Sequence, residues 1–107
     1  KETIFSERVN GEFKLRRGFK ILKGSKVLIV EDVITTGKSS LECSNLVLSN
    51  NAIVAGYATI IDRSNGKSDI KNRIVSQVNL DIPAYKKDEL PKELLSIPPI
   101  KPGSRSL

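Results

Sequence analysis

A chain of 107 residues with 38% hydrophobic and 28% charged side chains fits one small globular domain. It contains no apolar run of the roughly 18 residues that a transmembrane helix requires, so we expect no membrane partner. The net charge of +6 is concentrated between Arg8 and Lys26, where seven basic residues stand against one acid, Glu12. This stretch is expected to attract anions, and its charge alone does not separate small phosphorylated ligands from nucleic acid.

Two further features of the composition limit the classes of binding partner and the cellular compartment that we expect. Aromatic residues make up only 5% of the chain, which is too few for the interleaved aromatics of a single-strand binder, so we expect no nucleic-acid partner. The single cysteine, Cys43, cannot form an internal disulfide, and no secretion signal is recognisable, so we expect a cytoplasmic protein. The sequence has no methionine and begins at Lys1, so we expect a fragment of a longer chain.

The first element expected is a hairpin or flexible loop within residues 1–26. Turn-forming residues stand at Asn10-Gly11 and at Lys23-Gly24-Ser25, and apolar and polar residues alternate between them. The next run, Val27 to Val30, is short, apolar and β-branched, which is typical of a strand buried on both faces in a parallel sheet. The polar residues from Glu31 to Ser39 then predict a loop.

A helix is expected to start near Ser39 or Ser40 and to stop at residues 49–51, Ser-Asn-Asn. Its apolar side is expected to consist of Leu41, Val47 and Leu48. A second β-rich run covers residues 53–61. Strand, loop, helix and strand in this order predict a right-handed βαβ unit with parallel strands, so the fold class is α/β.

The rest of the chain predicts less regular structure. Val78, Leu80 and Ile82 alternate with polar residues, which predicts another short strand. From Tyr85 onward, four prolines and scattered charges predict an irregular tail over the surface.

The loop after the first strand has an order of residues that suits a sugar phosphate. Ligands of parallel α/β sheets bind where loops leave the carboxyl ends of strands. The adjacent carboxylates of Glu31 and Asp32 can accept hydrogen bonds from a vicinal diol. The turn from Thr35 to Ser39 enters a helix and offers hydroxyls and free backbone N–H groups to a phosphate, while Gly37 allows a close approach of the backbone. Together these features predict a site for ribose 5-phosphate.

Two simpler explanations of this loop are weaker. A nucleotide-binding P-loop would need a glycine at position 32, where the chain has Asp32, whose charge would repel a β-phosphate. An acidic strand end followed by a helix cap would explain an acidic pair or a Thr-Gly pair alone. The complete nonapeptide from Glu31 to Ser39 after an apolar strand is much rarer, which favours the sugar-phosphate interpretation.

Residues 27–40, VLIVEDVITTGKSS, resemble the signature of type I phosphoribosyltransferases that binds phosphoribosyl pyrophosphate (PRPP). Segments 15–19 (LRRGF), 62–66 (DRSNG) and 99–105 (PIKPGSR) narrow the resemblance to the orotate phosphoribosyltransferase family. The resemblance implies a Rossmann-like parallel sheet, present here as the C-terminal part of one domain. The chain is then expected to consist of a hairpin region (1–26), the PRPP-binding βαβ unit (27–63) and a final strand region with an irregular tail (64–107).

The resemblance also implies an activity. Enzymes of this family transfer the phosphoribosyl group of PRPP to N1 of orotate, giving orotidine 5′-monophosphate and pyrophosphate in pyrimidine biosynthesis. The implied cofactor is Mg²⁺, carried by PRPP without a direct protein ligand. The implied assembly is a cytoplasmic homodimer with PRPP and orotate as its small-molecule partners, and the fragment alone is expected to be inactive.

The implied site residues follow from the positions that match. Glu31 and Asp32 are the implied catalytic carboxylates, which bind the ribose diol. The implied PRPP site consists of Glu31, Asp32, Val33, Ile34, Thr35, Thr36, Gly37, Lys38 and Ser39. Thr35 and Arg63 match orotate-contacting positions, and the planar guanidinium of Arg63 suits a carboxylate. Relatives have a mobile basic loop at the position of residues 7–15, where Arg8 is the candidate, but the histidine of longer loops is absent.

Two alternatives stay open at the level of sequence. A PRPP-sensing regulator would have the same ligand loop, bind nucleic acid through its basic N-terminal stretch and catalyse nothing. Arg63 and segment 16–19 argue against this alternative. A related enzyme would keep the reaction and use a purine or uracil in place of orotate, and only the base specificity separates it from the orotate enzyme.

Overall fold

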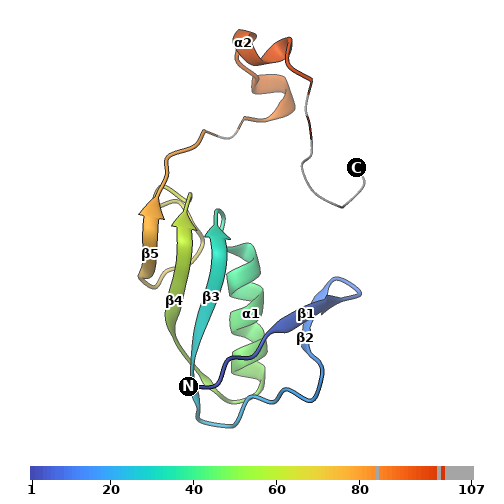
Figure 1. The fold of residues 1–107 in the computed structure, drawn as a ribbon, viewed down its shortest axis with the longest axis vertical. Helices are drawn as coiled ribbons and strands as arrows, with labels where there is room; N and C mark the ends of the chain where they lie inside the picture. Colours follow the sequence, from blue (N-terminus) through green and yellow to red (C-terminus); the bar gives the residue numbers. More distant parts are fainter. Residues whose placement is uncertain (84, 99, 101–107) are drawn as a thin grey trace.

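The computed structural model describes residues 1–83, 85–98 and 100. Strands β1 (Ser6–Val9) and β2 (Glu12–Leu15) form an antiparallel hairpin. The main sheet has the order β3-β4-β5, and all its strands are parallel. Its elements are β3 (Lys26–Ile34), β4 (Ile53–Asp62) and β5 (Ile74–Asn79), with helix α1 (Lys38–Ser49) between the first two. Figure 1 shows α1 alongside β3, with the hairpin beside α1 on the side away from β5.

The predicted hairpin and βαβ unit are both confirmed. Asn10 and Gly11 have φ angles of 51° and 86°, so a two-residue turn with left-handed backbone joins β1 to β2. The order β3, α1, β4 with parallel strands is the βαβ unit expected from the sequence. Asn51 adopts a left-handed φ of 55° directly after the helix, as its position in the Ser-Asn-Asn sequence indicated.

The core lies between the parallel sheet and α1. Its buried cluster consists of Ile29, Ile34, Tyr57 and Ile70. The Ser44 hydroxyl lies 2.6 Å from the Tyr57 hydroxyl and donates a hydrogen bond to the carbonyl oxygen of Ser40 at 2.9 Å. This contact joins the middle of α1 to the middle of β4. The Ser44 and Tyr57 side chains are both buried, so their hydroxyls bond to each other in place of water.

Several predicted boundaries were wrong, because pairing between strands extends or shifts the elements. The predicted loop from Glu31 to Ser39 is shorter, since β3 continues to Ile34, which pairs with Asp62. The helix begins at Lys38, one or two residues earlier than expected. The third strand covers Ile74–Asn79 instead of residues 78–82, because its first residues pair with the middle of β4.

Two expectations about packing and order were also corrected. Leu48 is 55% exposed, so the buried side of α1 consists of Ser40, Ser44 and Val47. The region expected to be irregular contains a short 3-10 helix, Lys87–Glu89, and a short helix α2, Lys92–Leu95, which Figure 1 shows away from the sheet. Of segment 99–105, only Ile100 belongs to the described residues. Pro99 and residues 101–105 lie outside them.

Only one face of the parallel sheet is covered within the described residues. Leu28 and Val30 are 55% and 67% exposed, so the prediction that β3 is buried on both faces was wrong for this structure. Ile60 of β4 and Val75 of β5 are also exposed. Strand alternation and register put these side chains on the face opposite α1. Parallel sheets are normally covered on both faces, so this apolar face is an incomplete part of a two-sided architecture.

The contact between Ser44 and Tyr57 leads to a prediction about stability. Ser44→Ala leaves the buried Tyr57 hydroxyl without its partner, and we expect a loss of about 1 to 3 kcal/mol in the free energy of unfolding. Tyr57→Phe removes the hydroxyl and leaves Ser44 bonded to the Ser40 carbonyl, so its cost should be smaller, about 1 kcal/mol. Urea denaturation of both variants at pH 7 measures the difference, and a larger cost for Tyr57→Phe would contradict this account.

Candidate functional site

The candidate site lies where β3 and β4 end side by side. Ile34 pairs with Asp62 in the last step of the ladder, and the backbone N–H of Arg63 donates a hydrogen bond to the Ile34 carbonyl oxygen at 2.8 Å. The loop that follows β3 and the residue that follows β4 therefore start from adjacent positions at one edge of the sheet (Figure 1). This edge, at the carboxyl ends of parallel strands, is the usual location of ligand sites in α/β folds.

The turn from Thr35 to Ser39, here named the phosphate turn, leads from β3 into α1. The Lys38 N–H donates to the Thr36 hydroxyl oxygen at 3.3 Å, and α1 begins without a side-chain hydrogen bond from its N-cap residue and without an acid in its first turn. Free N–H groups and the positive end of the helix dipole favour an anion at this place. The side chains of Thr35, Thr36, Lys38 and Ser39 are exposed, so an anion can reach them.

Gly37 is the buried centre of the phosphate turn. Its φ of 83° lies in the left-handed region, where residues with a Cβ are strained. A Cβ at this position would lie 2.8 Å from Cγ1 of Ile70, closer than any ordinary contact. A side chain at position 37 is therefore disfavoured twice, by the backbone conformation and by the contact with Ile70.

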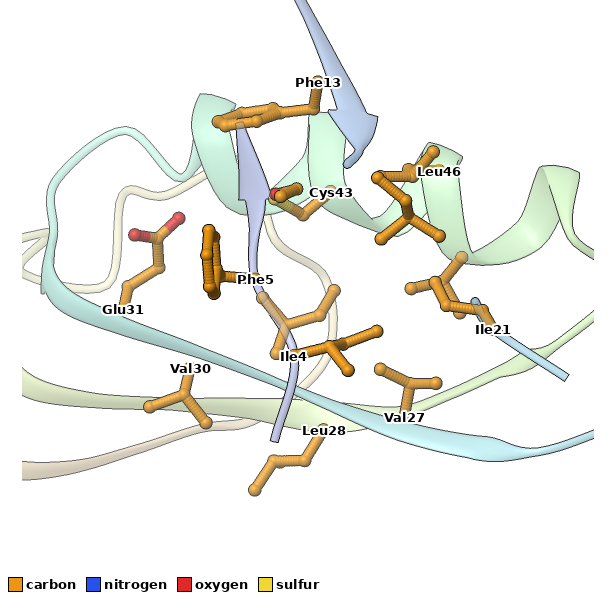
Figure 2. Close-up of a pocket in the computed structure, with 14 residues that line it drawn as sticks. Ile4, Phe5, Phe13, Ile21, Val27, Leu28, Val30, Glu31, Cys43 and Leu46 are labelled. Carbon is orange, nitrogen blue, oxygen red and sulfur yellow. The ribbon is translucent and has the colours of Figure 1, made fainter. Parts of the chain in front are cut away.

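Glu31 lies on the side of β3 that faces helix α1. Figure 2 shows its carboxylate on the same side of the strand as Phe13 and Cys43. Burial raises the pKa of Glu31 above its ordinary value of 4.5, the neighbouring charge of Asp32 raises it further, and a hydrogen bond from the Ser40 side chain acts in the opposite direction. The carboxyl group of Glu31 is thus less easily ionised than that of an exposed glutamate.

Asp32 occupies different surroundings although it is the next residue. It is exposed, and its Oδ1 accepts a hydrogen bond from the Val33 N–H at 2.7 Å. Its carbonyl oxygen accepts a hydrogen bond from the buried Thr59 hydroxyl at 3.0 Å, which fixes the backbone of the acidic pair. The two carboxylates expected to act together therefore share a strand end but differ in their burial.

The two apolar residues of the predicted PRPP site differ in accessibility. Val33 is 38% exposed, whereas Ile34 is only 1% exposed and belongs to the core. The Ile34 carbonyl oxygen is already occupied by the Arg63 N–H. Ile34 therefore anchors the end of β3 in the core. A ligand would approach its exposed neighbours, Val33 and Thr35.

Arg63 combines a fixed backbone with an unsatisfied side chain. Its Nε is buried and has no hydrogen-bond partner among the described residues. A buried N–H without an acceptor costs free energy, more so in a charged guanidinium, so this position favours an anionic acceptor from outside the chain. The side chain is partly exposed, which leaves room for such an acceptor.

Arg8, the candidate from the mobile loop, is engaged within the hairpin. It donates hydrogen bonds to the Gly11 carbonyl oxygen and to Glu42 of α1. Its guanidinium lies 4.3 Å from the centre of the Phe13 ring. These contacts hold the hairpin against α1, and a role of Arg8 in catalysis stays a prediction.

A mostly apolar cavity of about 240 Å³ lies beside the site, between the N-terminal segment, the hairpin and the unit of β3 and α1 (Figure 2). Glu31 and Cys43 are among the residues that line it. Burial raises the pKa of the Cys43 thiol, and the Ser6 hydroxyl lies 3.5 Å from its sulfur. A protonated thiol in apolar surroundings is a poor nucleophile, so Cys43 is part of the packing.

No three His, Cys, Asp or Glu side chains of the described residues gather closely enough to hold a metal ion. None of the described helices combines the length and the apolar character needed to cross a membrane.

Comparison with protein families places this geometry in context. Residues 2–89 match the model of the phosphoribosyl transferase domain, so the match includes the hairpin, the parallel sheet and the phosphate turn. The chain belongs to the phosphoribosyl transferase domain family. The family resemblance and the α/β fold class expected from the sequence are therefore confirmed.

Curated relatives of this phosphoribosyl transferase domain carry the name orotate phosphoribosyltransferase. The relative from Methylorubrum populi is 52% identical over 107 residues, which cover 99% of this chain and 55% of the relative. The relative from Maricaulis maris is 47% identical over 104 residues, which cover 97% of this chain and 54% of the relative. The chain thus spans about half the length of the curated relatives it matches.

Solved structures show the same fold. An adenine phosphoribosyltransferase from Thermoanaerobacter pseudethanolicus matches with a TM-score of 0.54 and 22% identity, covering 73% of this chain and 48% of that chain. An adenine phosphoribosyltransferase from Leishmania tarentolae matches with a TM-score of 0.51 and 24% identity, covering 64% of this chain and 37% of that chain. At such identities the likeness establishes the α/β fold alone.

Sequence reasoning missed the residues that hold the site of this phosphoribosyl transferase domain in place. Ile70 packs against Gly37, and the buried Thr59 bonds to the backbone of Asp32. Neither residue stands in a recognisable motif of its own. Both are apolar or weakly polar residues whose contacts depend on the path of a loop or on strand register, so the sequence alone carried no indication of their roles.

The crowding at Gly37 predicts a difference between two glycines. Gly37→Ala should lower the free energy of unfolding by about 1 to 3 kcal/mol more than Gly11→Ala. Gly11 has a similar φ of 86°, but a Cβ there meets nothing within 4 Å, so it is a control for backbone strain alone. Urea denaturation measures both losses, and equal losses would show that Ile70 moves aside without cost.

The raised pKa of Glu31 predicts a pH-dependent change of stability. Because the folded state binds the proton more tightly than the unfolded state, the contribution of Glu31 is most favourable below pH 4.5 and is lost as pH rises through the folded pKa. Glu31→Gln should therefore stabilise the protein at pH 7 relative to the natural sequence, and this gain should shrink toward pH 4. Thermal unfolding at both values tests this, with the exposed Glu2→Gln as control.

Proposed function

We propose that the full-length protein is an orotate phosphoribosyltransferase, which transfers the phosphoribosyl group of PRPP to orotate. The observation that carries the proposal is the state of Arg63: its buried Nε lacks a partner among the described residues, and its backbone follows β4 next to the end of β3, which leads into the phosphate turn. A substrate with a carboxylate would supply the missing acceptor, and orotate has one. The names of the curated relatives support the same substrate.

The phosphate turn is proposed to bind the 5-phosphate of PRPP. Its exposed hydroxyls and the free N–H groups at the start of α1 are suited to phosphate oxygens, and Lys38 adds a positive charge. Asp32 and Glu31 precede this turn and are proposed to hold the ribose hydroxyls. Asp32 is the more accessible acceptor, and Glu31 is partly buried.

The base is proposed to bind at Thr35 and Arg63. The guanidinium fork can donate two parallel hydrogen bonds to the carboxylate of orotate, which would orient the ring. N1 of orotate then attacks C1 of the ribose while the bond from C1 to the pyrophosphate oxygen breaks. The electron pair of that bond leaves with pyrophosphate, which also takes up the proton lost from N1. Positive charge develops on the ribose in this step, so the nearby carboxylate of Asp32 would stabilise the transition state.

The remaining parts of the proposal concern the whole protein. Mg²⁺ would be carried by the pyrophosphate oxygens of PRPP, where it neutralises charge on the leaving group. A homodimer is proposed from the family resemblance, and a cytoplasmic location is supported by the lone cysteine, which suits a reducing compartment. The product would enter the synthesis of pyrimidine nucleotides.

The experiment is an assay of orotidine 5′-monophosphate formation by the full-length protein, with Arg63→Ala and Arg63→Lys variants. We expect Arg63→Ala to raise the KM for orotate at least about tenfold with little change in the KM for PRPP, because only the base loses its partner. Arg63→Lys should recover part of the affinity, since an ammonium group keeps the charge but lacks the fork. The exposed Arg73→Ala is the matched control and should change neither constant.

The same assay separates this proposal from its alternatives. Uracil and adenine should be poor substrates, because neither has a carboxylate for Arg63. Use of uracil at the rate of orotate would contradict the assigned role of Arg63. Binding of PRPP without any product from orotate, uracil or adenine would favour a regulator over an enzyme.

A further inference from the structure

The phosphate turn is supported from behind by the segment that follows β4. The backbone N–H of Asp69 donates a hydrogen bond to the Thr36 carbonyl oxygen at 2.9 Å, which joins this segment to the turn. The segment is itself folded into a tight turn, because the Lys67 N–H donates to the Ser64 carbonyl oxygen at 2.8 Å and the Ser64 N–H donates to Asp62 Oδ1 at 2.8 Å. It therefore presents a defined surface to the phosphate turn.

Ile70 is the side chain through which this segment reaches Gly37. A Cβ on Gly37 would lie 2.8 Å from Cγ1 and 3.0 Å from Cδ1 of Ile70, so the isoleucine fills the space that a side chain at position 37 would need. Ile70 is 7% exposed and shares the core cluster with Ile29 and Ile34. The core of the sheet thus extends through Ile70 to the back of the phosphate turn.

A phosphate held mainly by backbone N–H groups requires those groups to be fixed in direction before the ligand arrives. Any freedom of the turn would have to be removed on binding, which weakens affinity. Ile70 has no polar atom that could touch phosphate, so it can affect binding only through the conformation of Gly37 and the N–H groups after it.

We propose that Ile70 is a positioning residue for the sugar phosphate: it holds Gly37 in its left-handed conformation and so aims the N–H groups of the phosphate turn. This inference rests on the proposed function of that turn. The supporting segment begins directly after Arg63, so one short stretch of chain connects the proposed base-binding residue with the back of the phosphate site.

The test compares Ile70→Ala with Ile29→Ala in the full-length protein. Ile29 is the matched control, because it is the same residue type, is also 7% exposed and belongs to the same core cluster, but lies in the middle of β3. We expect both variants to lose similar amounts of melting temperature. Calorimetry should show that Ile70→Ala raises the Kd for PRPP at least about tenfold, whereas Ile29→Ala changes it by less than about twofold.

Steady-state kinetics provide a readout that general destabilisation does not produce. Ile70→Ala should raise the KM for PRPP and leave the KM for orotate and kcat close to their normal values, because the 5-phosphate is bound equally in ground and transition states. If either alanine variant does not fold, Ile70→Val and Ile29→Val replace the pair, since each removes only a terminal methyl group. Equal effects of the two positions on PRPP affinity would overturn the proposal.

The outcome also distinguishes this inference from the function on which it rests. Absence of PRPP binding by the natural protein would contradict the proposed function. Normal PRPP binding by the natural protein together with equal effects at positions 70 and 29 would contradict only the positioning role of Ile70.

Discussion

The parallel pairing of β3 with β4 is the constraint on which the rest of this structure depends. Its last step aligns Ile34 with Asp62 and is extended by the hydrogen bond from the Arg63 N–H to the Ile34 carbonyl oxygen. Parallel strands need a crossover, and α1 supplies it, which delivers the start of the helix to the same edge of the sheet. The phosphate turn and Arg63, separated by more than twenty residues in the chain, therefore start from the same edge of the sheet.

Within that site, neighbouring residues are given different chemical environments by the geometry of the strand. Glu31 is partly buried toward α1, where desolvation raises its pKa, while Asp32 is exposed. Two acids that follow each other in the sequence therefore differ in their contact with water.

One apolar face of the sheet is uncovered within the described residues. Leu28 and Val30 on β3 are largely exposed, whereas strands of parallel sheets are usually covered on both faces. The chain spans about half the length of its curated relatives. The phosphate turn and its support by Ile70 are nevertheless complete, because their contacts come from residues 34–70.

The sequence by itself determined the features that depend on neighbours along the chain. The Asn10-Gly11 turn, the βαβ order and the composition of the phosphate turn were predicted, because backbone preferences and hydrophobic periodicity act over a few residues. Only the tertiary structure decided the bounds of β5, the different burial of the two acids and the contact of Ile70 with Gly37. These features depend on strand register and on the path of a loop. Both are set by packing between residues far apart in the chain, which no local sequence pattern specifies.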